Sequence, residues 1–291
     1  MATGETITGS LADSLNDMVS AARIVREHEG VMVQCCEHQT LGKGIGLSWN
    51  EISFSNLEDA QAISETTWLR NAQQLSDTKF SVTPTVIGIL VIITDRVKAR
   101  ISPKSLAKTG GLAQSSIQRK KNADGLTMLD GFSNSYCGAG STLTSGHIGA
   151  AKALITGNST EPGPPPYNCV LHGYQLHDIE DEFLAGVGTY ALPAGITADT
   201  LRDNFSGMLH GCRIFVDGNI TIDSGDDAKG GVFSQSAIVL VQGRSPWKET
   251  KRLPDYGGGA DAVYLYDEFA YGERADSMGC EIVSDATAPT S

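Results

Sequence analysis

The sequence predicts a mixed α+β fold, and three observations support this class. An apolar run over 80–101 suits one long strand, and a helical pattern follows it from Ser102 to about Asp130. Residues 144–243 then combine shorter helical patterns with short strand patterns. Helices and strands that are grouped rather than strictly alternating are typical of α+β architectures.

The bulk properties exclude several classes of protein. The chain has 291 residues, enough for a sizeable core, and carries 22 Lys and Arg against 34 Asp and Glu, a net charge of −12. This acidic balance argues against a dedicated nucleic-acid binder, because contacts to phosphate need basic side chains. The chain starts without a signal-peptide pattern and has no apolar run of about 20 residues, so we expect a soluble protein made inside the cell, with no membrane contact.

The first 79 residues divide into a predicted helix and a segment that we expect to project from the globule. Residues 10–29 predict a helix that Ser10 caps and Gly30 ends, and an extended segment begins at Val31. Residues 36–79 contain few apolar residues at either the helical or the strand period, so they cannot supply a hydrophobic core of their own. We predict a long two-stranded loop that leaves the globule, with Gly42–Gly46 at its tip and a neighbouring chain to stabilise it.

The middle of the chain supplies a strand and a long helix. The 80–101 strand has Pro84 near its start, which confines that part to an edge position. Ser102 and Pro103 open the helix as cap and first-turn residue. We expect Ile117 and Leu126 to lie against a sheet, and the basic run Arg119–Lys121 to be solvated or between subunits.

Residues 144–243 predict a compact α+β unit, and the rest of the chain predicts long strands. Helices are expected after the cap Thr144–Ser145, around Ile179, and over 197–209, with acidic residues 178 and 180–182 mostly outward. Strands are expected at 169–171, 213–216 and 237–241. The segment 248–285 is extended around Gly257–Gly259, and we expect it to pair with the 80–101 strand, since neither has a partner nearby in sequence.

The candidate chemical sites are weak. His172 and His177 are five apart, which does not fit a zinc pair on one helix face. Asp and Asn residues crowd the turn 217–227, but their spacing does not match a calcium loop, and these residues are common in turns. The glycine-rich stretches lack the lysine of a phosphate-binding loop, and the serines lack the spacing of a nucleophile elbow. We therefore expect no enzyme, no cofactor and no metal.

The cysteines predict a reducing environment. The six are Cys35, Cys36, Cys137, Cys169, Cys212 and Cys280, and none forms a CxxC pair. Cysteines scattered through a chain of this size usually act as small, buried apolar residues of a protein in a reducing compartment. We expect all six to be reduced.

Several short segments resemble the major capsid proteins of tailed bacteriophages. They are Val91–Asp95, Val170–Gln175, Ile214–Val216, Gly230–Ser234, Val263–Tyr266, Tyr271–Arg274 and Ile282–Asp285. The resemblance implies the Hong Kong 97 type fold. Its parts would be an N-terminal arm (1–35), an extended loop (36–79), a peripheral domain with a spine helix (80–143), an axial domain (144–243) and closing peripheral strands (244–291).

The resemblance also implies a function. The chain would be a major capsid protein that self-assembles through hexamers and pentamers into an icosahedral shell, and the shell would enclose double-stranded DNA without sequence-specific binding. Because only about thirty residues precede the loop, the scaffolding protein would be separate; a portal and decoration proteins are further expected partners. Assembly would take place in the host cytoplasm and the product would be the virion capsid. The expected inter-subunit residues are Gly42, Lys43, Gly44, Gly46 and Trp49.

Three alternatives remain open. An encapsulin-type compartment would enclose cargo enzymes in a shell of the same fold. The 144–243 unit could instead be a small hydrolase domain with an accessory hairpin, although the sequence places no nucleophile beside a base. A host-cell adhesin or tail protein would more often show repeats, and the sequence has no internal repeat.

Overall fold

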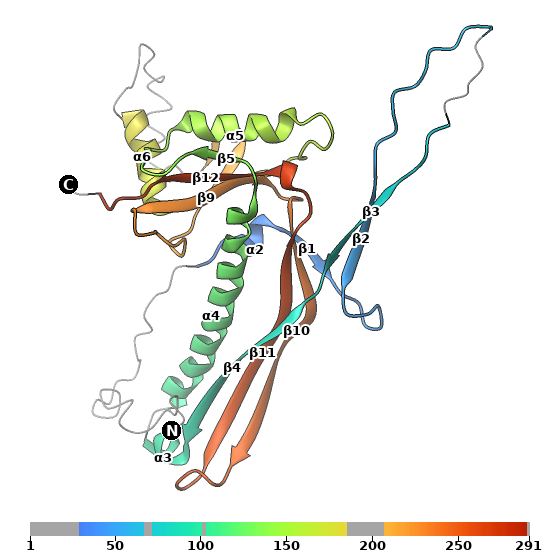
Figure 1. Ribbon diagram of the computed structural model, residues 1–291. Helices are drawn as coiled ribbons and strands as arrows, with labels where there is room; N and C mark the ends of the chain where they lie inside the picture. The colour runs from blue at the N-terminus through green and yellow to red at the C-terminus, as the bar shows by residue number, and fades with distance from the viewer. Residues whose placement is uncertain (1–28, 67–71, 101–102, 185–206, 290–291) are drawn as a thin grey trace.

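The computed structural model describes residues 29–66, 72–100, 103–184 and 207–289. It contains a long four-stranded sheet, a compact six-stranded sheet and a separate two-stranded hairpin (Figure 1). The α+β class is confirmed. The predicted helix at 10–29 and most of that at 197–209 lie outside the described residues.

The long sheet joins strands from distant parts of the sequence. Its order is β1 (Glu37–Thr40), β10 (Ile238–Leu253), β11 (Ala260–Glu273) and β4 (Thr85–Thr94). β11 is antiparallel to both β10 and β4, and Val263 lies opposite Val91. The predicted pairing between the strand before the long helix and the strands near the end of the chain is confirmed.

The predicted strand over 80–101 is too long. It divides into β3 (Asp77–Val82), β4 and a short helix, α3 (Asp95–Arg100). Pro84 separates the two strands, since proline cannot donate to a ladder. At the other end the Thr94 hydroxyl accepts from the backbone N–H of Val97 at 3.4 Å, which begins the helix.

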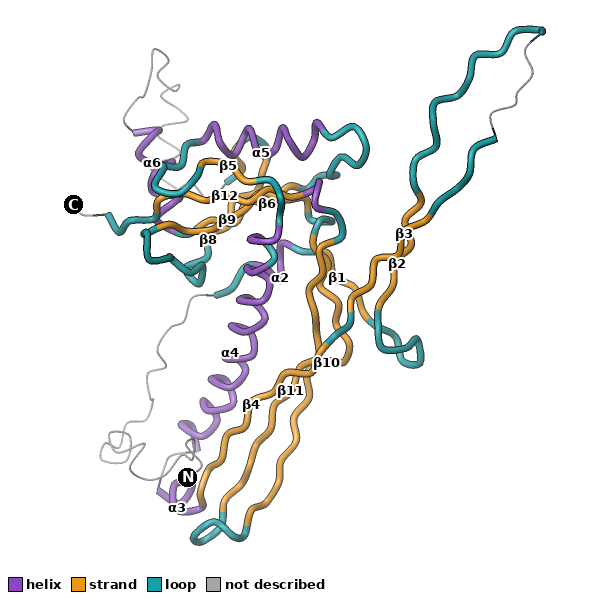
Figure 2. Tube along the Cα trace, in the orientation of Figure 1, coloured by secondary structure: helices purple, strands orange, loops and turns teal. Residues whose placement is uncertain are grey.

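Helix α4 (Pro103–Thr127) covers one face of the long sheet (Figure 2). Ile117 is 3% exposed and Leu126 packs against the core, as predicted. A short 3-10 helix, Leu129–Gly131, continues the chain. The basic run is exposed at Arg119 and Lys120 but not at Lys121, so that part of the prediction is wrong.

Lys121 is buried because it has partners beneath the helix. Its Nζ lies 2.6 Å from Oε1 of Gln242 and 3.3 Å from Oδ2 of Asp267. It also lies 4.8 Å from the centre of the Phe269 ring. A buried ammonium group needs such compensation. These contacts fix α4 against β10 and β11.

The compact sheet draws on more of the chain than residues 144–243. Its order is β5 (Ser135–Cys137), β12 (Gly279–Asp285), β9 (Asp227–Ser234), β6 (Tyr167–Leu171), β8 (Cys212–Val216) and β7 (Met208–Leu209). β12 pairs with β9, so the last strand returns to this sheet and not to the long one. Met208 and Leu209 form a strand, which corrects the predicted end of the third helix.

Among the residues described in the compact unit, two helices pack on its sheet, α5 (Ser145–Gly157) and α6 (Gly173–Leu184). Thr144 and His147 form a capping box at the start of α5. Two acidic residues of α6 accept hydrogen bonds from backbone N–H groups at the N-terminal end of α5. Asp178 accepts from the backbone N–H of Leu143, and Glu182 accepts from that of Ser145. They therefore face α5 rather than solvent, which corrects the outward placement predicted for them.

The N-terminal described segment forms a turn of helix, α2 (Met32–Cys35), where an extended segment is predicted. The Asn122 side chain on α4 accepts from the backbone N–H of Met32 at 3.1 Å, and Met32 is buried. Cys35 and Cys36 are buried with it. All six cysteines are free, and only Cys137 is partly exposed.

Candidate assembly surface: the projecting hairpin and its anchor

The most prominent surface feature is a hairpin of β2 (Trp49–Phe54) and β3, which projects away from both sheets (Figure 1). Within the described part of the chain the two strands pair only with each other, in register from Trp49–Val82 to Phe54–Asp77. Isolated two-stranded hairpins are marginally stable in water. The arrangement confirms that this part of the chain leaves the globule.

The projecting part exposes apolar side chains. Along β2, Ile52 is 57% exposed and Phe54 is 68% exposed. Beyond the paired strands, Leu57, Ile63 and Leu75 are each more than half exposed. A run of exposed apolar residues on a thin element marks an interaction surface.

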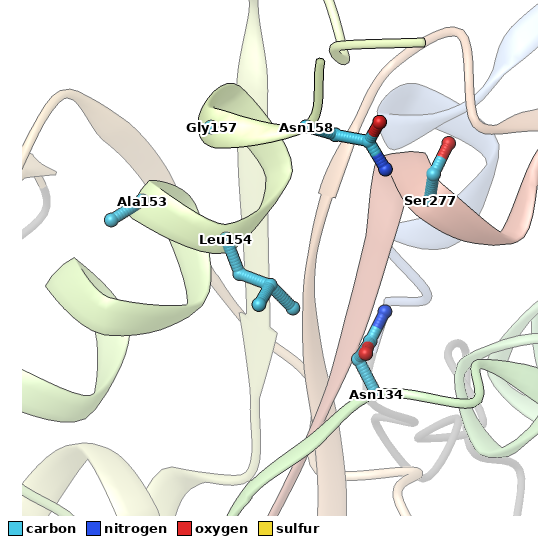
Figure 3. Close-up of a pocket in the computed structure, with 6 residues that line it drawn as sticks. All are labelled: Asn134, Ala153, Leu154, Gly157, Asn158 and Ser277. Carbon is cyan, nitrogen blue, oxygen red and sulfur yellow. The ribbon is translucent and has the colours of Figure 1, made fainter. Parts of the chain in front are cut away.

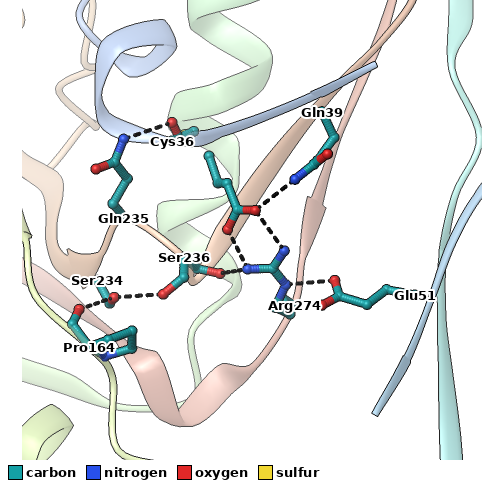
Figure 4. Close-up of polar contacts among 9 residues, drawn as sticks. Cys36, Gln39, Glu51, Pro164, Ser234, Gln235, Ser236 and Arg274 are labelled. Carbon is teal, nitrogen blue, oxygen red and sulfur yellow. Dashed lines mark hydrogen bonds and ion pairs between the residues drawn. The ribbon is translucent and has the colours of Figure 1, made fainter. Parts of the chain in front are cut away.

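A charged clamp holds the base of the hairpin to the long sheet. Arg274 directly follows β11; its Nε donates to Glu51 on β2 at 2.8 Å, and its two terminal nitrogens donate to Glu37 on β1 at 2.5 and 3.1 Å. One of these nitrogens also reaches the Ser236 carbonyl at 3.0 Å (Figure 4). The hydrogen bonds from Arg274 lower the pKa of the Glu37 carboxyl. The hairpin is thus fixed at one end and projects at the other.

An apolar cluster lies beside the clamp. The Trp49 and Phe80 rings meet edge to face, 6.1 Å between centres, and pack on Val82 and its sheet neighbours. Gly272 on β11 allows this close approach, because a Cβ there would lie 2.4 Å from Val82 and 2.8 Å from the Phe80 ring. Trp49, predicted as an inter-subunit residue, therefore packs within its own chain.

The glycine-rich turn is not at the tip. Residues 41–48 connect β1 to β2 near the base of the hairpin, whereas 55–66 and 72–76 lie in its distal part (Figure 2). The predicted tip position is wrong because β1 already belongs to the long sheet, where it pairs in parallel with β10. Gly42, Lys43, Gly44 and Gly46 are exposed, and Gly44 and Gly46 have φ of 85° and 114°. Those angles are the reason for glycine at both positions.

The other candidate sites have ordinary structural roles. Asp217 is buried and accepts from the Asn122 amide at 2.6 Å and from the backbone N–H of Asn219 at 2.9 Å. Asp223 accepts from the backbone N–H groups of Gly225 and Asp227, and so organises its turn. His177 lies 3.7 Å from Asp181 within α6. No group of acidic, His or Cys side chains in the described ranges is arranged to hold a metal ion.

One open pocket of about 380 Å³ lies between α5 and the segments that contain Asn134 and Ser277 (Figure 3). Its lining combines amides, one hydroxyl and the apolar Ala153 and Leu154. The Ser277 hydroxyl donates to the carbonyl of Glu161 at 3.2 Å, and no base lies among the lining residues. This pocket does not supply the nucleophile and base that the hydrolase alternative requires. Among the described helices, none is long and apolar enough to cross a membrane.

No family model and no curated protein sequence matches this chain. Solved structures do match it. A capsid chain of cyanophage Pam1 aligns over 99% of this chain and 100% of its own length, with a TM-score of 0.71 and 13% identity. The chain has the phage capsid fold. The Hong Kong 97 type architecture implied by the sequence resemblance is confirmed.

Two further structures with this capsid fold cover most of the chain. The capsid chain of Helicobacter pylori bacteriophage KHP30 aligns over 98% of this chain and 100% of its own, with a TM-score of 0.70 and 12% identity. The capsid chain of Ralstonia phage GP4 aligns over 94% and 96%, with a TM-score of 0.70 and 12% identity. The similarity therefore includes both sheets and the hairpin.

Sequence reasoning missed the Arg274 clamp. The segment Tyr271–Arg274 is part of the capsid resemblance, but its arginine has no predicted role there. The available signal was an arginine directly after a strand whose charged residues are all acidic. The clamp partners, Glu37 and Glu51, lie in the segment 36–79, where no local pattern indicates a contact with the end of β11.

Proposed function

We propose that this chain is the major capsid protein of a tailed-phage type particle and self-assembles through hexamers and pentamers into an icosahedral shell around double-stranded DNA. The single observation that carries the proposal is the capsid fold, which matches phage capsid chains over almost their whole length. In this reading the long sheet with α4 is the peripheral domain, and the compact sheet with α5 and α6 is the axial domain. Residues 1–35 form the N-terminal arm.

The hairpin supports assembly. Its base is fixed by Arg274 and by the Trp49–Phe80 cluster, whereas its distal apolar residues have no cover in the single chain. Burying such residues against a second copy would stabilise both partners, by about 25 cal/mol for each Å² of apolar surface removed from water. The turn residues Gly42, Lys43, Gly44 and Gly46 are exposed beside this hairpin. We assign them to the contact between subunits, together with the half-buried Trp49, which also positions the hairpin from within its own subunit.

The remaining partners follow from the same proposal. A separate scaffolding protein, a portal and decoration proteins would act with the shell, and assembly would take place in the host cytoplasm to give a virion capsid. The encapsulin-type compartment has no observation of its own in its favour. The two differ in what the shells contain, DNA or cargo enzymes.

Electron microscopy of the purified chain, expressed with and without the neighbouring genes of its genome, tests the proposal. Closed shells of uniform size are expected. A chain that stays monomeric under all salt and scaffold conditions, with an ordered hairpin, would contradict it. Shells that co-purify with an enzyme rather than with a portal and DNA would identify the compartment alternative.

A further inference from the structure

Strand β4 lies at an open edge of the long sheet. It pairs with β11 on one side, and no described strand pairs with its other side. Its ten residues include no charged residue and no proline, and its register with β11 is unbroken. Edge strands are usually protected from other chains by lysine, proline, a bulge or short length. β4 has none of these protections and is therefore a ready surface for strand pairing.

The register shows which backbone groups of β4 point toward this edge. The N–H of Asp95 donates to the carbonyl of Gly259 at 2.9 Å, and these two residues continue the register of β4 with β11. In an antiparallel pair, residues that exchange hydrogen bonds alternate with residues whose backbone groups point away. The odd-numbered residues of β4 therefore bond to β11. The N–H and C=O groups that point outward within the strand belong to the even-numbered residues, which include Val86, Gly88, Leu90 and Ile92.

Gly88 shows that the edge is accessible in the described part of the chain. Glycine has only backbone atoms, so the exposure of Gly88 in the middle of β4 is exposure of the backbone itself. Tyr266 fills the space beside it on one face of the sheet, because a Cβ at Gly88 would lie 2.6 Å from that ring. Helix α4 packs on the other face. Solvent therefore reaches Gly88 from the edge, and the neighbouring Val86 and Leu90 are 57% and 46% exposed.

The strand that matches this edge best is β4 itself. The other open edge strands of the described sheets are shorter, with four residues in β1, three in β5, two in β7 and six each in β2 and β3. β2 and β3 also carry charged residues, namely Glu51, Asp77 and Lys79. Only a second β4 offers ten uncharged residues with a row of outward backbone groups.

We propose that β4 pairs antiparallel with β4 of a second copy across a twofold axis, and so joins the long sheets of two subunits. The inference rests on the proposed function. Contacts around a hexamer or a pentamer join two different surfaces, whereas an icosahedral shell also has twofold axes, where a surface meets its own copy. An uncharged edge strand is self-complementary, because its backbone donors and acceptors pair with those of an identical strand.

The backbone groups fix the register of this pair. With Leu90 opposite Leu90 of the second copy, Gly88 lies opposite Ile92, and the outward groups of each strand face those of the other. A shift by one residue would place outward groups opposite groups already bonded to β11. A parallel pair would bring both α3 helices, with the exposed Arg96 and Arg100, to the same end. The antiparallel pair keeps these like charges apart.

Disulfide formation tests the register. Leu90→Cys and Val86→Cys are made in a Cys137→Ser background, which removes the one partly exposed natural thiol. Directly opposite residues of a hydrogen-bonded pair have Cα atoms about 5.5 Å apart, which suits a disulfide. Two residues at position 86 would instead be eight residues apart along the pair, about 26 Å. Oxidation of intact shells, verified by electron microscopy, should therefore give a covalent dimer in Leu90→Cys only.

The outcomes separate the inference from the proposed function. Shells of Leu90→Cys that give no dimer, or equal amounts of dimer in both variants, would overturn the inference but leave the shell proposal standing. Failure of the natural chain to form shells would overturn both.

Two further measurements do not depend on a disulfide. Leu90→Lys places two ammonium groups opposite each other at the axis and should lower the yield of closed shells, whereas Val86→Lys should not, because its opposite residue is Thr94. Circular dichroism should show both variants folded, since each side chain is exposed in the single chain. In the natural chain, hydrogen exchange of β4 amides should be slower in shells than in dissociated subunits. Equal shell yields or equal exchange would overturn the inference, and slow exchange without the Leu90→Cys dimer would show that a different strand occupies the edge.

Discussion

Arg274 donates to both carboxylate oxygens of Glu37, through its two terminal nitrogens at 2.5 and 3.1 Å. This two-point contact joins the end of β11 to β1, and the remaining Nε reaches Glu51 on the projecting hairpin. A planar guanidinium can hold two carboxylates in fixed directions, which a lysine cannot. Arg274 therefore sets the direction in which the hairpin leaves the sheet together with the Trp49–Phe80 cluster.

Replacing Arg274 by Met should destabilise the unassembled chain by about 1.5–3 kcal/mol, because two carboxylates lose their charged donor. Urea unfolding measures the change, and limited trypsin digestion at Lys79 reports the hairpin itself. Arg274→Lys should recover only part of the stability, since one ammonium group cannot make the same set of bonds. Lys79→Gln on the exposed surface of β3 is the control for urea unfolding. Full rescue by Lys would show that charge alone is sufficient.

The Glu37–Arg274 contact should make stability depend on pH. The contact lowers the pKa of Glu37, so its contribution is fully present above the unfolded-state value of about 4.3 and disappears as the pH falls through the folded-state value. The gap in urea midpoint between the natural chain and Glu37→Gln should therefore narrow below about pH 4.3. Glu58→Gln, on the exposed distal part, is the control for the loss of a carboxylate that does not contact Arg274. A constant gap for Glu37→Gln would contradict the assignment.

Replacing Ile117 by Asp should prevent folding. Ile117 is 3% exposed between α4 and the long sheet, and an unpaired carboxylate there costs at least about 3 kcal/mol. Ser115→Asp introduces the same charge two residues earlier, on the exposed face, and should fold normally. Circular dichroism and yield of soluble protein distinguish the two. Normal folding of Ile117→Asp would show that α4 does not pack on the sheet through this face.

All six thiols should be reduced in the purified chain. Burial raises the pKa of Cys35 to about 12 and that of Cys280 likewise to about 12, so neither forms much thiolate near pH 8. Alkylation of the native chain should modify Cys137 first, and alkylation after denaturation should modify six thiols, as counted by mass spectrometry. A stoichiometric disulfide would overturn the expected reducing environment.

The sequence allowed much of the long sheet to be predicted. β4 and the strands after residue 248 are long and apolar at alternate positions, so pairing them across the inserted unit follows from the need to bury both. The burial of Lys121 was not predicted, because the sequence alone does not show a partner for its charge. It lies four residues after Ile117, on the same helix face, so the helical period alone places it toward the sheet. The buried carboxylate of Asp267 pairs with the Lys121 ammonium, and this partner becomes evident only when the structure places β11 beneath α4.

The position of the hairpin was harder to predict. β1 has the sequence Glu-His-Gln-Thr, which carries no apolar alternation, and its pairing with β10 depends on backbone hydrogen bonds. When β1 is not recognised as a strand, the glycines at 42–46 are placed at the tip of the projecting loop. Likewise, β12 joins the compact sheet through β9, whose Gly-Gly pair weakens its strand pattern. Local patterns identify the elements; long-range pairing decides to which sheet they belong.

Replacing Gly272 by Ala should loosen the hairpin at its base. The added Cβ would lie 2.4 Å from Val82 and 2.8 Å from Phe80, so β3 must move away from β11 or the chain must bear the clash. Overpacking of this kind costs about 1–3 kcal/mol. Gly257→Ala is the matched control, because nothing lies within 4 Å of its Cβ and its φ is not in the left-handed region. Hydrogen exchange should show faster exchange of β2 and β3 amides in Gly272→Ala alone, with the compact sheet unchanged. Equal protection in both variants would show that the hairpin does not depend on close packing at Gly272.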